Sequence, residues 1–443
     1  MEYLKKANPG TSDVDREVSD IVAGLLDDIK RDGENAVRAL NENLDGYTGA
    51  VVVPEEAFAE AHKQLPDGVK DDLRFAHRRV TDFAMRQRDS IVEFETELAD
   101  GLVGGQRLIP VSTAGCYVPG GRYAHAASAI MSAGTAQAAG VRNIVAATPG
   151  NAGGEVNPAI LFALQLCGAS AVLVAGGVQG IASLAYGLFS GRAADIVVGP
   201  GNRYVAEAKR QLFGAIGIDV IAGPTESLII ADAAADPAVV AADLAGQAEH
   251  GADSPVWLIT TDRRLADAVL ELMPRVIAAL PEPARTAASS AWRDYGEVVL
   301  VDSREQACEV SDRYAAEHLH VQASDPGWWL ERLNNYGSLF LGEETTVAFG
   351  DKCSGPNHIL PTRRAARYTG GLSALNFIKV VSYQRMTRDA AAQVAPVAAR
   401  ISRLEGMEGH ARTGDVRLRK YFPERQFQLH NEDVDWSPDN DPD

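Results

Sequence analysis

The segment Gln247-Ala248-Glu249-His250-Gly251 brings an amide, a carboxylate and an imidazole close together. If this segment is helical, Gln247 and His250 lie three positions apart on one face, so both side chains could reach a single metal ion. Alternatively, Gly251 ends a helix and the histidine is an ordinary hydrogen-bonded residue. The spacing therefore permits a metal site without requiring one.

An acid and an imidazole are adjacent at Glu317-His318, where a short helix or loop is expected to meet the strand Leu319 to Gln322. Histidine titrates near neutral pH, and burial can raise a carboxylate toward the same range, so the two could divide the work of proton transfer. An acid–base pair on the surface with no catalytic role is the alternative. The pair is a candidate catalytic site at the entrance of a strand.

Two later segments carry further possible ligands. The run from Gly350 to His358 contains two glycines and a proline, which predict a shaped loop rather than a core element. Asp351 in this run could be a hard oxygen ligand or could form an Asx turn. Glu405 and His410 lie near the end of the last long helical pattern, where an ordinary amphipathic helix end is the alternative.

A glycine turn at Gly176-Gly177-Val178-Gln179-Gly180 follows an apolar run and opens a helical pattern. Free backbone N–H groups at a helix start suit a pyrophosphate. The turn is not a full GxGxxG fingerprint, and the sequence offers no evident acidic residue for a ribose. A plain strand-to-helix turn is an equal alternative.

Short β-rich runs alternate with helical segments over most of the chain, which predicts α/β architecture with parallel-rich sheets. Residues 13 to about 95 are predicted to be helical, as is the segment after residue 372, which ends near Tyr421. We expect strands at residues 143–147, 171–175, 195–198, 227–231, 256–259, 298–301, 318–321 and 338–341.

The bulk composition excludes several classes of protein. At 443 residues the chain predicts more than one domain, and its net charge of -18 argues against a nucleic-acid partner or an anionic lipid surface. The four cysteines contain no CxxC pair, and no apolar run of about 18 residues or signal peptide is evident. We therefore expect a reduced, cytoplasmic protein with no membrane contact.

Taken together and in this order, the clusters resemble the histidinol dehydrogenase family over nearly the whole chain. The segments that carry the resemblance are Ala114 to Arg122, Val198 to Asn202 with Ala206 to Arg210, Ala222-Gly223-Pro224-Thr225-Glu226, Gln247 to Gly251, Ala316-Glu317-His318-Leu319, Gly350-Asp351 with Ser354-Gly355 and Asn357-His358, and Glu405 with His410.

The resemblance implies an enzyme that uses one Zn²⁺ per subunit and NAD to oxidise an alcohol through the aldehyde to the carboxylate. It implies zinc ligands at Gln247, His250, Asp351 and His410, a catalytic pair at Glu317 and His318, and NAD contacts at Tyr117, Gln179 and Asn202. Substrate contacts would come from Thr225, Gln247, His250, His318, Asp351, Glu405 and His410. It also implies a homodimer with shared active sites, in which Glu405 and His410 complete the partner's site.

On the same basis we expect two incomplete Rossmann-like domains and an exchanged helical segment. The expected boundaries are an N-terminal arm at 1–12, a discontinuous first domain at 13–116 and 228–372, a second domain at 117–227, a helical dimerisation segment at 373–421 and a flexible acidic tail at 422–443.

Several segments look closest to the sulfopropanediol 3-dehydrogenase branch of the family, namely Arg122-Tyr123-Ala124-His125, Gly342 to Thr346 and Arg400 to His410. That branch oxidises 2,3-dihydroxypropane-1-sulfonate to sulfolactate. Lys352, Arg363 and Arg364 are cations near the expected site, where they would attract an anionic substrate. We expect one of them, together with His125, to meet the sulfonate. The alternatives are histidinol oxidation and a non-catalytic binding protein on the same scaffold.

Overall fold

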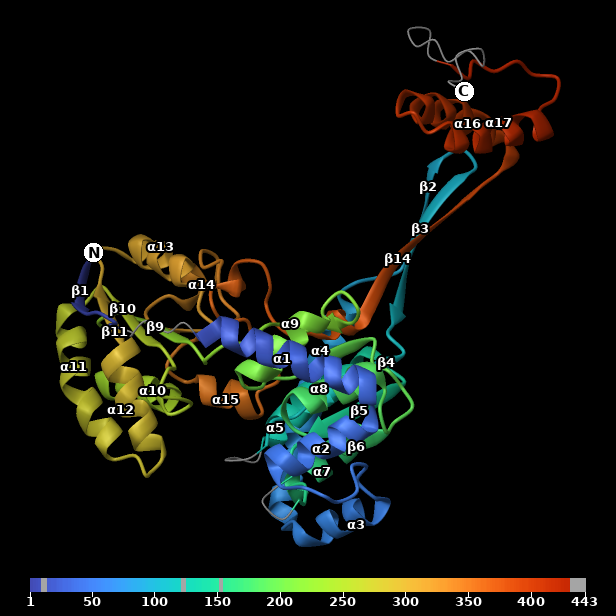
Figure 1. Cartoon of the computed structure of the whole chain (residues 1–443). Helices are drawn as coiled ribbons and strands as arrows, with labels where there is room; N and C mark the ends of the chain where they lie inside the picture. Colours follow the sequence, from blue (N-terminus) through green and yellow to red (C-terminus); the bar gives the residue numbers. More distant parts are fainter. Residues whose placement is uncertain (9–13, 121–124, 151–153, 431–443) are drawn as a thin grey trace. The chain divides into compact units, whose positions relative to one another are not determined.

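The computed structural model describes residues 1–8, 14–120, 125–150 and 154–430, and these form two compact units (Figure 1). The large unit consists of Met1–Ser90 and Pro110–Ile378, and the small unit consists of Ile91–Ile109 and Lys379–Asp443. Each unit is therefore built from two separate stretches of chain.

A five-stranded parallel sheet forms one half of the large unit, with strand order β6-β5-β4-β7-β8. The order reverses between β4 and β7, as in a doubly wound fold, so the ends of these two strands flank a switch point. The strands are β4 (Thr113–Tyr117), β5 (Asn143–Thr148), β6 (Ala171–Val174), β7 (Ile196–Val198) and β8 (Gly217–Ile218).

Helices cover this sheet on both faces, and every residue of the central strand β4 is therefore buried. One face packs against α1 (Val14–Asp32), α2 (Glu34–Asp45), α8 (Gly177–Tyr186) and α9 (Arg203–Leu212). The remaining helices of this half are α3 (Glu55–Gln64), α4 (Asp67–Asp89), α5 (Ala126–Ala129), a π-helical turn (Ile130–Gly134), α6 (Thr135–Ala139) and α7 (Pro158–Leu166).

The second half of the large unit is a six-stranded sheet of order β1-β11-β10-β9-β12-β13, parallel except for its first strand β1. Its five parallel strands repeat the doubly wound order of the first sheet, with the reversal between β9 and β12. The strands are β1 (Glu2–Lys5), β9 (Ser227–Ala231), β10 (Val256–Thr260), β11 (Glu297–Leu300), β12 (His318–Gln322) and β13 (Ser338–Leu341).

Successive side chains of these strands point to opposite faces of the sheet, and each face packs into its own apolar core. One core contains side chains of α10 (Pro237–Ala248), α11 (Arg263–Ala278) and α12 (Ala284–Tyr295), and the other contains side chains of α13 (Arg304–Tyr314) and α14 (Pro326–Leu330). The short helix α15 (Val347–Lys352) and two 3₁₀ turns (Ala365–Arg367 and Ala374–Phe377) complete the large unit.

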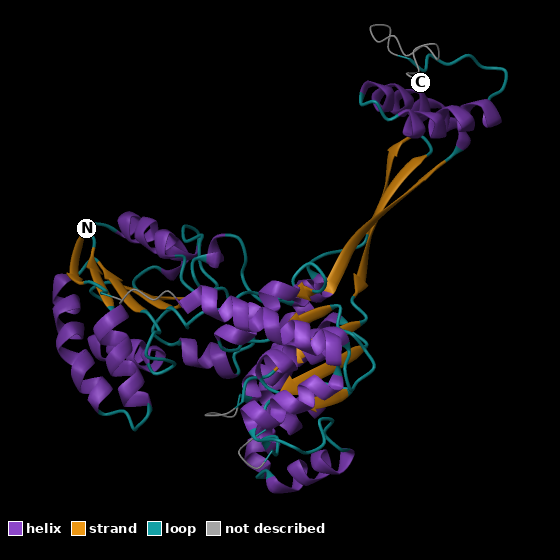
Figure 2. Ribbon diagram, in the orientation of Figure 1, coloured by secondary structure: helices purple, strands orange, loops and turns teal. Residues whose placement is uncertain are grey.

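The small unit combines a three-stranded sheet with a pair of helices (Figure 2). Its strands are β2 (Phe94–Ala99), β3 (Leu102–Pro110) and β14 (Ile378–Met386), with β3 in the middle, and its helices are α16 (Arg388–Leu404) and α17 (Glu408–Tyr421). The two helices pack against each other.

The expected α/β fold with parallel-rich sheets and a helical C-terminal segment is confirmed, but several segments lie elsewhere than expected. Helices α1 and α2 share a core with the five-stranded sheet, and β4 belongs to that sheet, so residues 13–116 do not group with 228–372. Residues of the expected N-terminal arm form β1. The strand β14 lies in a segment that we expected to be helical, and the hairpin β2–β3, which begins where the first helical segment was expected to end, was not predicted. The expected acidic tail is described only as far as residue 430.

A buried ion pair fixes the loop that follows β7. The ammonium of Lys209 lies 2.6 Å from Asp219 and also donates to the carbonyl oxygens of Gly199 and Val220, while the second carboxylate oxygen of Asp219 accepts the N–H of Gly199. Both side chains are essentially inaccessible to solvent. Gly199 has φ of +125°, and a Cβ there would lie 2.0 Å from the carbonyl oxygen of Tyr117, so this close passage requires glycine.

We predict that Lys209→Met destabilises the protein by about 3–5 kcal/mol, because removing one partner leaves a buried carboxylate unpaired. Chemical denaturation of the variant and the wild type measures the change. The matched control is Arg275→Met on α11, whose pair with Glu271 is exposed and should contribute about 0–1 kcal/mol. Equal losses in the two variants would contradict the prediction.

Candidate active site

A cavity of about 1050 Å³ in the large unit contains most of the expected metal donors, and we call it the donor cavity. Its walls come from α4, from the C-terminal end of α10, from the loop before α12 and from α15. The described residues that line it include His125, Ser128, Gln247, His250, Asp351, Lys352, Cys353 and His358.

Gln247 and His250 reach the donor cavity from the carboxyl end of α10. The helix ends at Ala248, and His250 lies in the turn that follows, where its N–H donates to the carbonyl oxygen of Gln247 at 3.3 Å. Gln247 is buried, and its Oε1 atom has no hydrogen-bond partner among the described residues. A buried amide oxygen without a partner is costly, which indicates that this atom serves a ligand.

Asp351 lies in the last turn of α15 rather than in a loop, contrary to the expectation from its glycine-rich surroundings. Its carboxylate lies 3.9 Å from Nε2 of His250 and 3.5 Å from Nε2 of His318. Burial would raise the pKa of Asp351, but the interactions with His318 and with two further histidines outweigh burial and hold it at about 2. The group is therefore an anion at neutral pH.

Glu317 and His318 are both buried, so the alternative of a surface pair is excluded. They lie at the amino end of β12, where the backbone of Glu226 holds both: its N–H donates to Oε2 of Glu317 at 3.0 Å, and its carbonyl oxygen lies 3.2 Å from Nδ1 of His318. A carbonyl oxygen only accepts, so Nδ1 carries a proton. Nε2 faces Asp351 and has no hydrogen-bond partner within the described part of the chain.

The pKa values of both members of the pair are raised. Burial raises the pKa of Glu317 against the opposing effect of His318. Burial would lower the pKa of His318, but the neighbouring carboxylates of Glu317 and Asp351 outweigh it and raise the pKa. Burial likewise raises the pKa of Glu226 to about 7. Proton transfer near neutral pH is therefore within the range of this cluster.

The donor set fits a zinc ion, although it is not complete within the large unit. An amide oxygen, an imidazole nitrogen and a carboxylate meet at one cavity, and the unpartnered Oε1 of Gln247 lies among them. Across the described part of the chain, no group of three His, Cys, Asp or Glu residues could hold a metal ion. Gln247 is outside those four residue types, so only two of the three expected ligands in the large unit, His250 and Asp351, belong to them. A tetrahedral site needs a fourth ligand.

The other expected donor, His410, belongs to the small unit together with Glu405. Glu405 follows the last residue of α16, His410 lies in the first turn of α17, and both residues are exposed. Thr225, the remaining expected substrate contact, lies directly before Glu226 and is partly buried.

Two of the three expected NAD contacts, Tyr117 and Asn202, follow the strands β4 and β7 that flank the switch point of the five-stranded sheet, and the third, Gln179, lies in α8 after the edge strand β6. Tyr117 ends β4, and its hydroxyl accepts the N–H of Gly177 at the start of α8. Asn202 follows β7 and caps α9, with its side chain accepting the N–H groups of Tyr204 and Val205. These helix starts can bind a pyrophosphate, and Gly177 has φ of +50°, which favours glycine there.

An acidic residue does adjoin this glycine turn, although none was evident in the sequence. Gln179, which is buried in α8, donates from its amide to Asp45 at the end of α2, at 3.1 Å. A Cβ on Gly176 would lie 3.4 Å from the Asp45 carboxylate, so the acid lies beside the turn. Burial raises the pKa of Asp45. Asp45 lies more than a hundred residues before the turn in sequence, so spacing rules could not reveal it.

Of the four cations expected to meet a sulfonate, the structure brings Lys352 and His125 to the donor cavity. Arg363 and Arg364 are not among the described residues that line it. Both have positive φ angles, and the N–H of Arg363 donates to Oε1 of Glu226, so this turn braces the catalytic cluster from outside. Arg122, Tyr123 and Ala124 lie outside the described residues.

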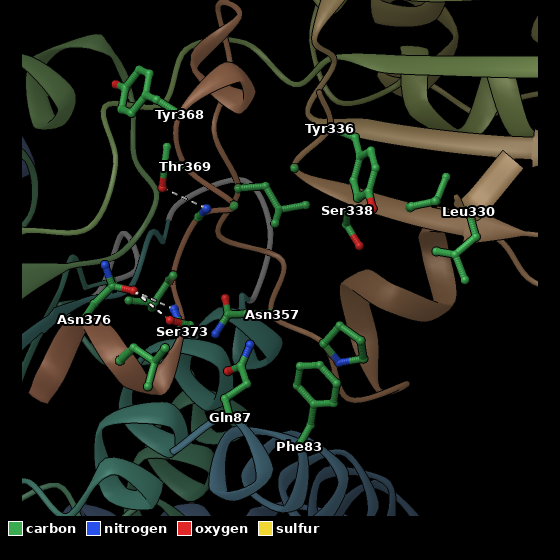
Figure 3. Close-up of a pocket in the computed structure, with 18 of the residues that line it drawn as sticks. Phe83, Gln87, Leu330, Tyr336, Ser338, Asn357, Tyr368, Thr369, Ser373 and Asn376 are labelled. Atoms are coloured by element: carbon green, nitrogen blue, oxygen red, sulfur yellow. Dashed lines mark hydrogen bonds between the residues drawn. The ribbon is translucent and has the colours of Figure 1, made fainter. Parts of the chain in front are cut away.

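A second cavity of about 690 Å³ has a different character (Figure 3). Uncharged side chains of α4, β13 and the segment 356–376 surround it, among them Phe83, Tyr336, Ser338 and Tyr368. Asn357 points its amide to the carbonyl oxygen of Met131 and to Thr135 instead. Of these two cavities, only the donor cavity is lined by charged side chains.

No helix in the described part of the chain is long and apolar enough to cross a membrane.

Comparisons with known proteins identify the family and the fold of the chain. Residues 9–418 match the family model described as histidinol dehydrogenase. The chain is 55% identical to a histidinol dehydrogenase homolog of Pelagibacter ubique, covering 95% of this chain and 99% of the relative. It is 52% identical to the sulfopropanediol 3-dehydrogenase of Ruegeria pomeroyi, covering 97% and 99%.

Among solved structures, the crystal structure of histidinol dehydrogenase from Elizabethkingia anophelis superposes with a TM-score of 0.87 at 32% identity, covering 94% of each chain. Sequence and fold therefore agree over nearly the full length. This chain belongs to the histidinol dehydrogenase family.

Proposed function

We propose that this protein is a zinc-dependent, NAD-linked dehydrogenase that oxidises 2,3-dihydroxypropane-1-sulfonate through the aldehyde to sulfolactate. Members of its family generally use NAD and bind zinc. The observation that carries the proposal is the meeting of Gln247, His250 and Asp351 at one cavity beside Nε2 of His318.

The chemistry divides between the ligands and the chain. When bound, zinc polarises the substrate oxygen and NAD accepts hydride. Nε2 of His318 takes the proton of the hydroxyl when the imidazole is neutral, because Nδ1 keeps the proton that it donates to the Glu226 carbonyl oxygen and Nε2 faces Asp351. The raised pKa of His318 would be opposed by the positive charge of a bound zinc ion, which would favour this neutral form. Glu317, whose pKa burial raises, assists the addition of water to the aldehyde. Two equivalents of NAD are reduced for each alcohol converted to carboxylate.

The choice of a sulfonate substrate is supported by one cation of the cavity wall, Lys352, which is the only lysine or arginine among the described residues that line it, beside the carboxylates of Asp72, Glu249, Glu282 and Asp351. The ammonium of Lys352 directly follows the donor Asp351, and His125 lines the same cavity. A fixed cation suits a sulfonate and opposes histidinol, which is itself a cation. The chain is also 52% identical to a sulfopropanediol 3-dehydrogenase, against 40% for the histidinol dehydrogenase of Thermus thermophilus.

We further propose that a second copy of the chain supplies Glu405 and His410. The large unit offers three donors where zinc takes four, and these two residues are exposed on the small unit. The outer face of α16 also exposes Val397, Ile401 and Leu404 at helical spacing. An apolar stripe beside unsatisfied ligands fits an interface between copies of this chain.

The first experiment tests substrate and metal together. With purified protein, we expect NAD reduction with 2,3-dihydroxypropane-1-sulfonate, loss of activity after treatment with a chelator, and recovery when Zn²⁺ is returned. The kcat/KM for this diol should exceed that for histidinol by at least about 100-fold, which corresponds to roughly 2.7 kcal/mol. Turnover of histidinol alone would refute the sulfonate assignment, and turnover of neither would refute the dehydrogenase assignment.

Substitution of Lys352 tests the sulfonate contact. We expect Lys352→Ala to raise the KM for the sulfonate diol by about 10-fold or more, because a charge-assisted hydrogen bond contributes about 1.5–3 kcal/mol. The kcat should change little. Arg364→Ala is the control, because Arg364 is an exposed cation of the neighbouring loop that does not line the cavity. If steady-state kinetics instead showed a raised KM for Arg364→Ala and an unchanged KM for Lys352→Ala, the sulfonate contact would belong to the arginine turn and not to Lys352.

Complementation tests the shared site. Asp351→Ala and His410→Ala should each be inactive alone. If each site combines one chain's large unit with the partner's small unit, a mixed dimer of these two variants contains one intact site. Random mixing by co-expression should then restore about 25% of wild-type activity. Failure of any recovery in a verified mixed dimer would show that each chain completes its own site.

A further inference from the structure

A second polar cluster, partly buried, adjoins the candidate active site and takes no part in the proposed chemistry. Asp243 on α10 is its centre. One of its carboxylate oxygens accepts the side-chain amide of Gln322 on β12 at 2.7 Å, and the other accepts the hydroxyl of Thr346 at 2.9 Å. The carboxylate also lies 3.4 Å from Nδ1 of His320. We call these four residues the Asp243 cluster.

His320, the fourth member of the cluster, is completely buried, and both of its ring nitrogens have polar neighbours. Its Nε2 atom lies 2.8 Å from the carbonyl oxygen of Gly342, so Nε2 carries a proton and donates to that oxygen. Its Nδ1 atom lies 3.3 Å from the amide of Gln322. The Asp243 carboxylate therefore joins three segments that are far apart in sequence.

Each of these segments also carries a residue of the active site. Asp243 precedes Gln247 by four positions on α10, so the two share a helix face. Thr346 directly precedes α15, which carries Asp351, and His320 follows His318 by two positions on β12, so both imidazoles lie on one face of the strand. Both imidazoles also adjoin the ring of Phe340.

We propose that Asp243 is a positioning residue that holds the zinc donors Gln247 and Asp351 in register with His318. The hydrogen bonding of Thr346 is the main support for this proposal. It occupies the cap position of α15, where a threonine hydroxyl commonly accepts a backbone N–H of the helix, yet it makes no such bond and its hydroxyl donates to Asp243 instead. The start of α15 is thus tied to α10 through this contact between side chains.

This inference rests on the proposed function, because the donors matter only if the protein binds zinc. Residues that orient metal ligands typically change metal affinity by about 10–100-fold when they are removed. A role confined to stability would instead lower the unfolding temperature and leave the affinity of the folded protein for zinc unchanged.

The test compares Thr346→Val with Thr346→Ser in the full-length protein. Valine keeps the shape and removes the hydroxyl donor, while serine keeps the donor. We expect Thr346→Val to weaken Zn²⁺ binding by at least about 10-fold in competition with a chelator, and Thr346→Ser to bind within about threefold of the wild type. The thermal midpoint of each metal-free variant is measured alongside.

Asp236→Ala is the matched control. Asp236 caps the opposite end of α10 by accepting the N–H of Ala238, so its loss should lower the thermal midpoint without changing the zinc affinity. Equal zinc affinities of Thr346→Val and the wild type would overturn the inference and leave the proposed function standing. A wild-type protein that binds no zinc would overturn both.

Discussion

Burial of three carboxylates around a single imidazole is the constraint on which this active site depends. Glu226, Glu317 and Asp351 are all buried near His318, so the cluster has more potential negative charge than His318 can balance. Buried charge without a partner is costly, and two effects reduce the negative charge that is left unpaired in this cluster. Raised pKa values let Glu226 and Glu317 hold protons near neutrality, and Asp351 remains an anion that a divalent cation would stabilise.

The helices around the two ligand regions have opposite polarity, which fits opposite ligand charges. Gln247 and Asp351 lie in the last turns of α10 and α15, where helix dipoles favour a cation. Gly177 and Asn202 lie at the starts of α8 and α9, where exposed N–H groups favour an anion. The expected NAD contact Tyr117 lies at the carboxyl edge of the five-stranded sheet, where the doubly wound rule places ligands, whereas the candidate catalytic pair Glu317-His318 lies at the amino edge of β12.

Periodicity and short motifs predicted much of this arrangement and failed where the information is not local. Most strands of the two large sheets were predicted because each is an apolar run that ends in a turn, and the buried pair Glu317-His318 was located by residue type. The hairpin β2–β3 was missed because β2 is exposed along its whole length, β3 is mostly only partly buried, and neither strand is a continuous apolar run. Asp45 and Asp243 were missed because each acts through residues distant in sequence.

The small unit has too little apolar interior to be stable by itself. The residues buried on its helices are mainly alanine and glycine, and the charged pair Arg403 and Asp415 lies among them at 2.6 Å. Methyl groups bury little area, and a buried ion pair adds little net stability. Larger apolar side chains such as Leu404 and Val416 are exposed instead. A unit built this way would gain stability from a surface that covers it. If the proposed association of two chains supplies that surface, folding of the unit and completion of the proposed zinc site would depend on the same contact.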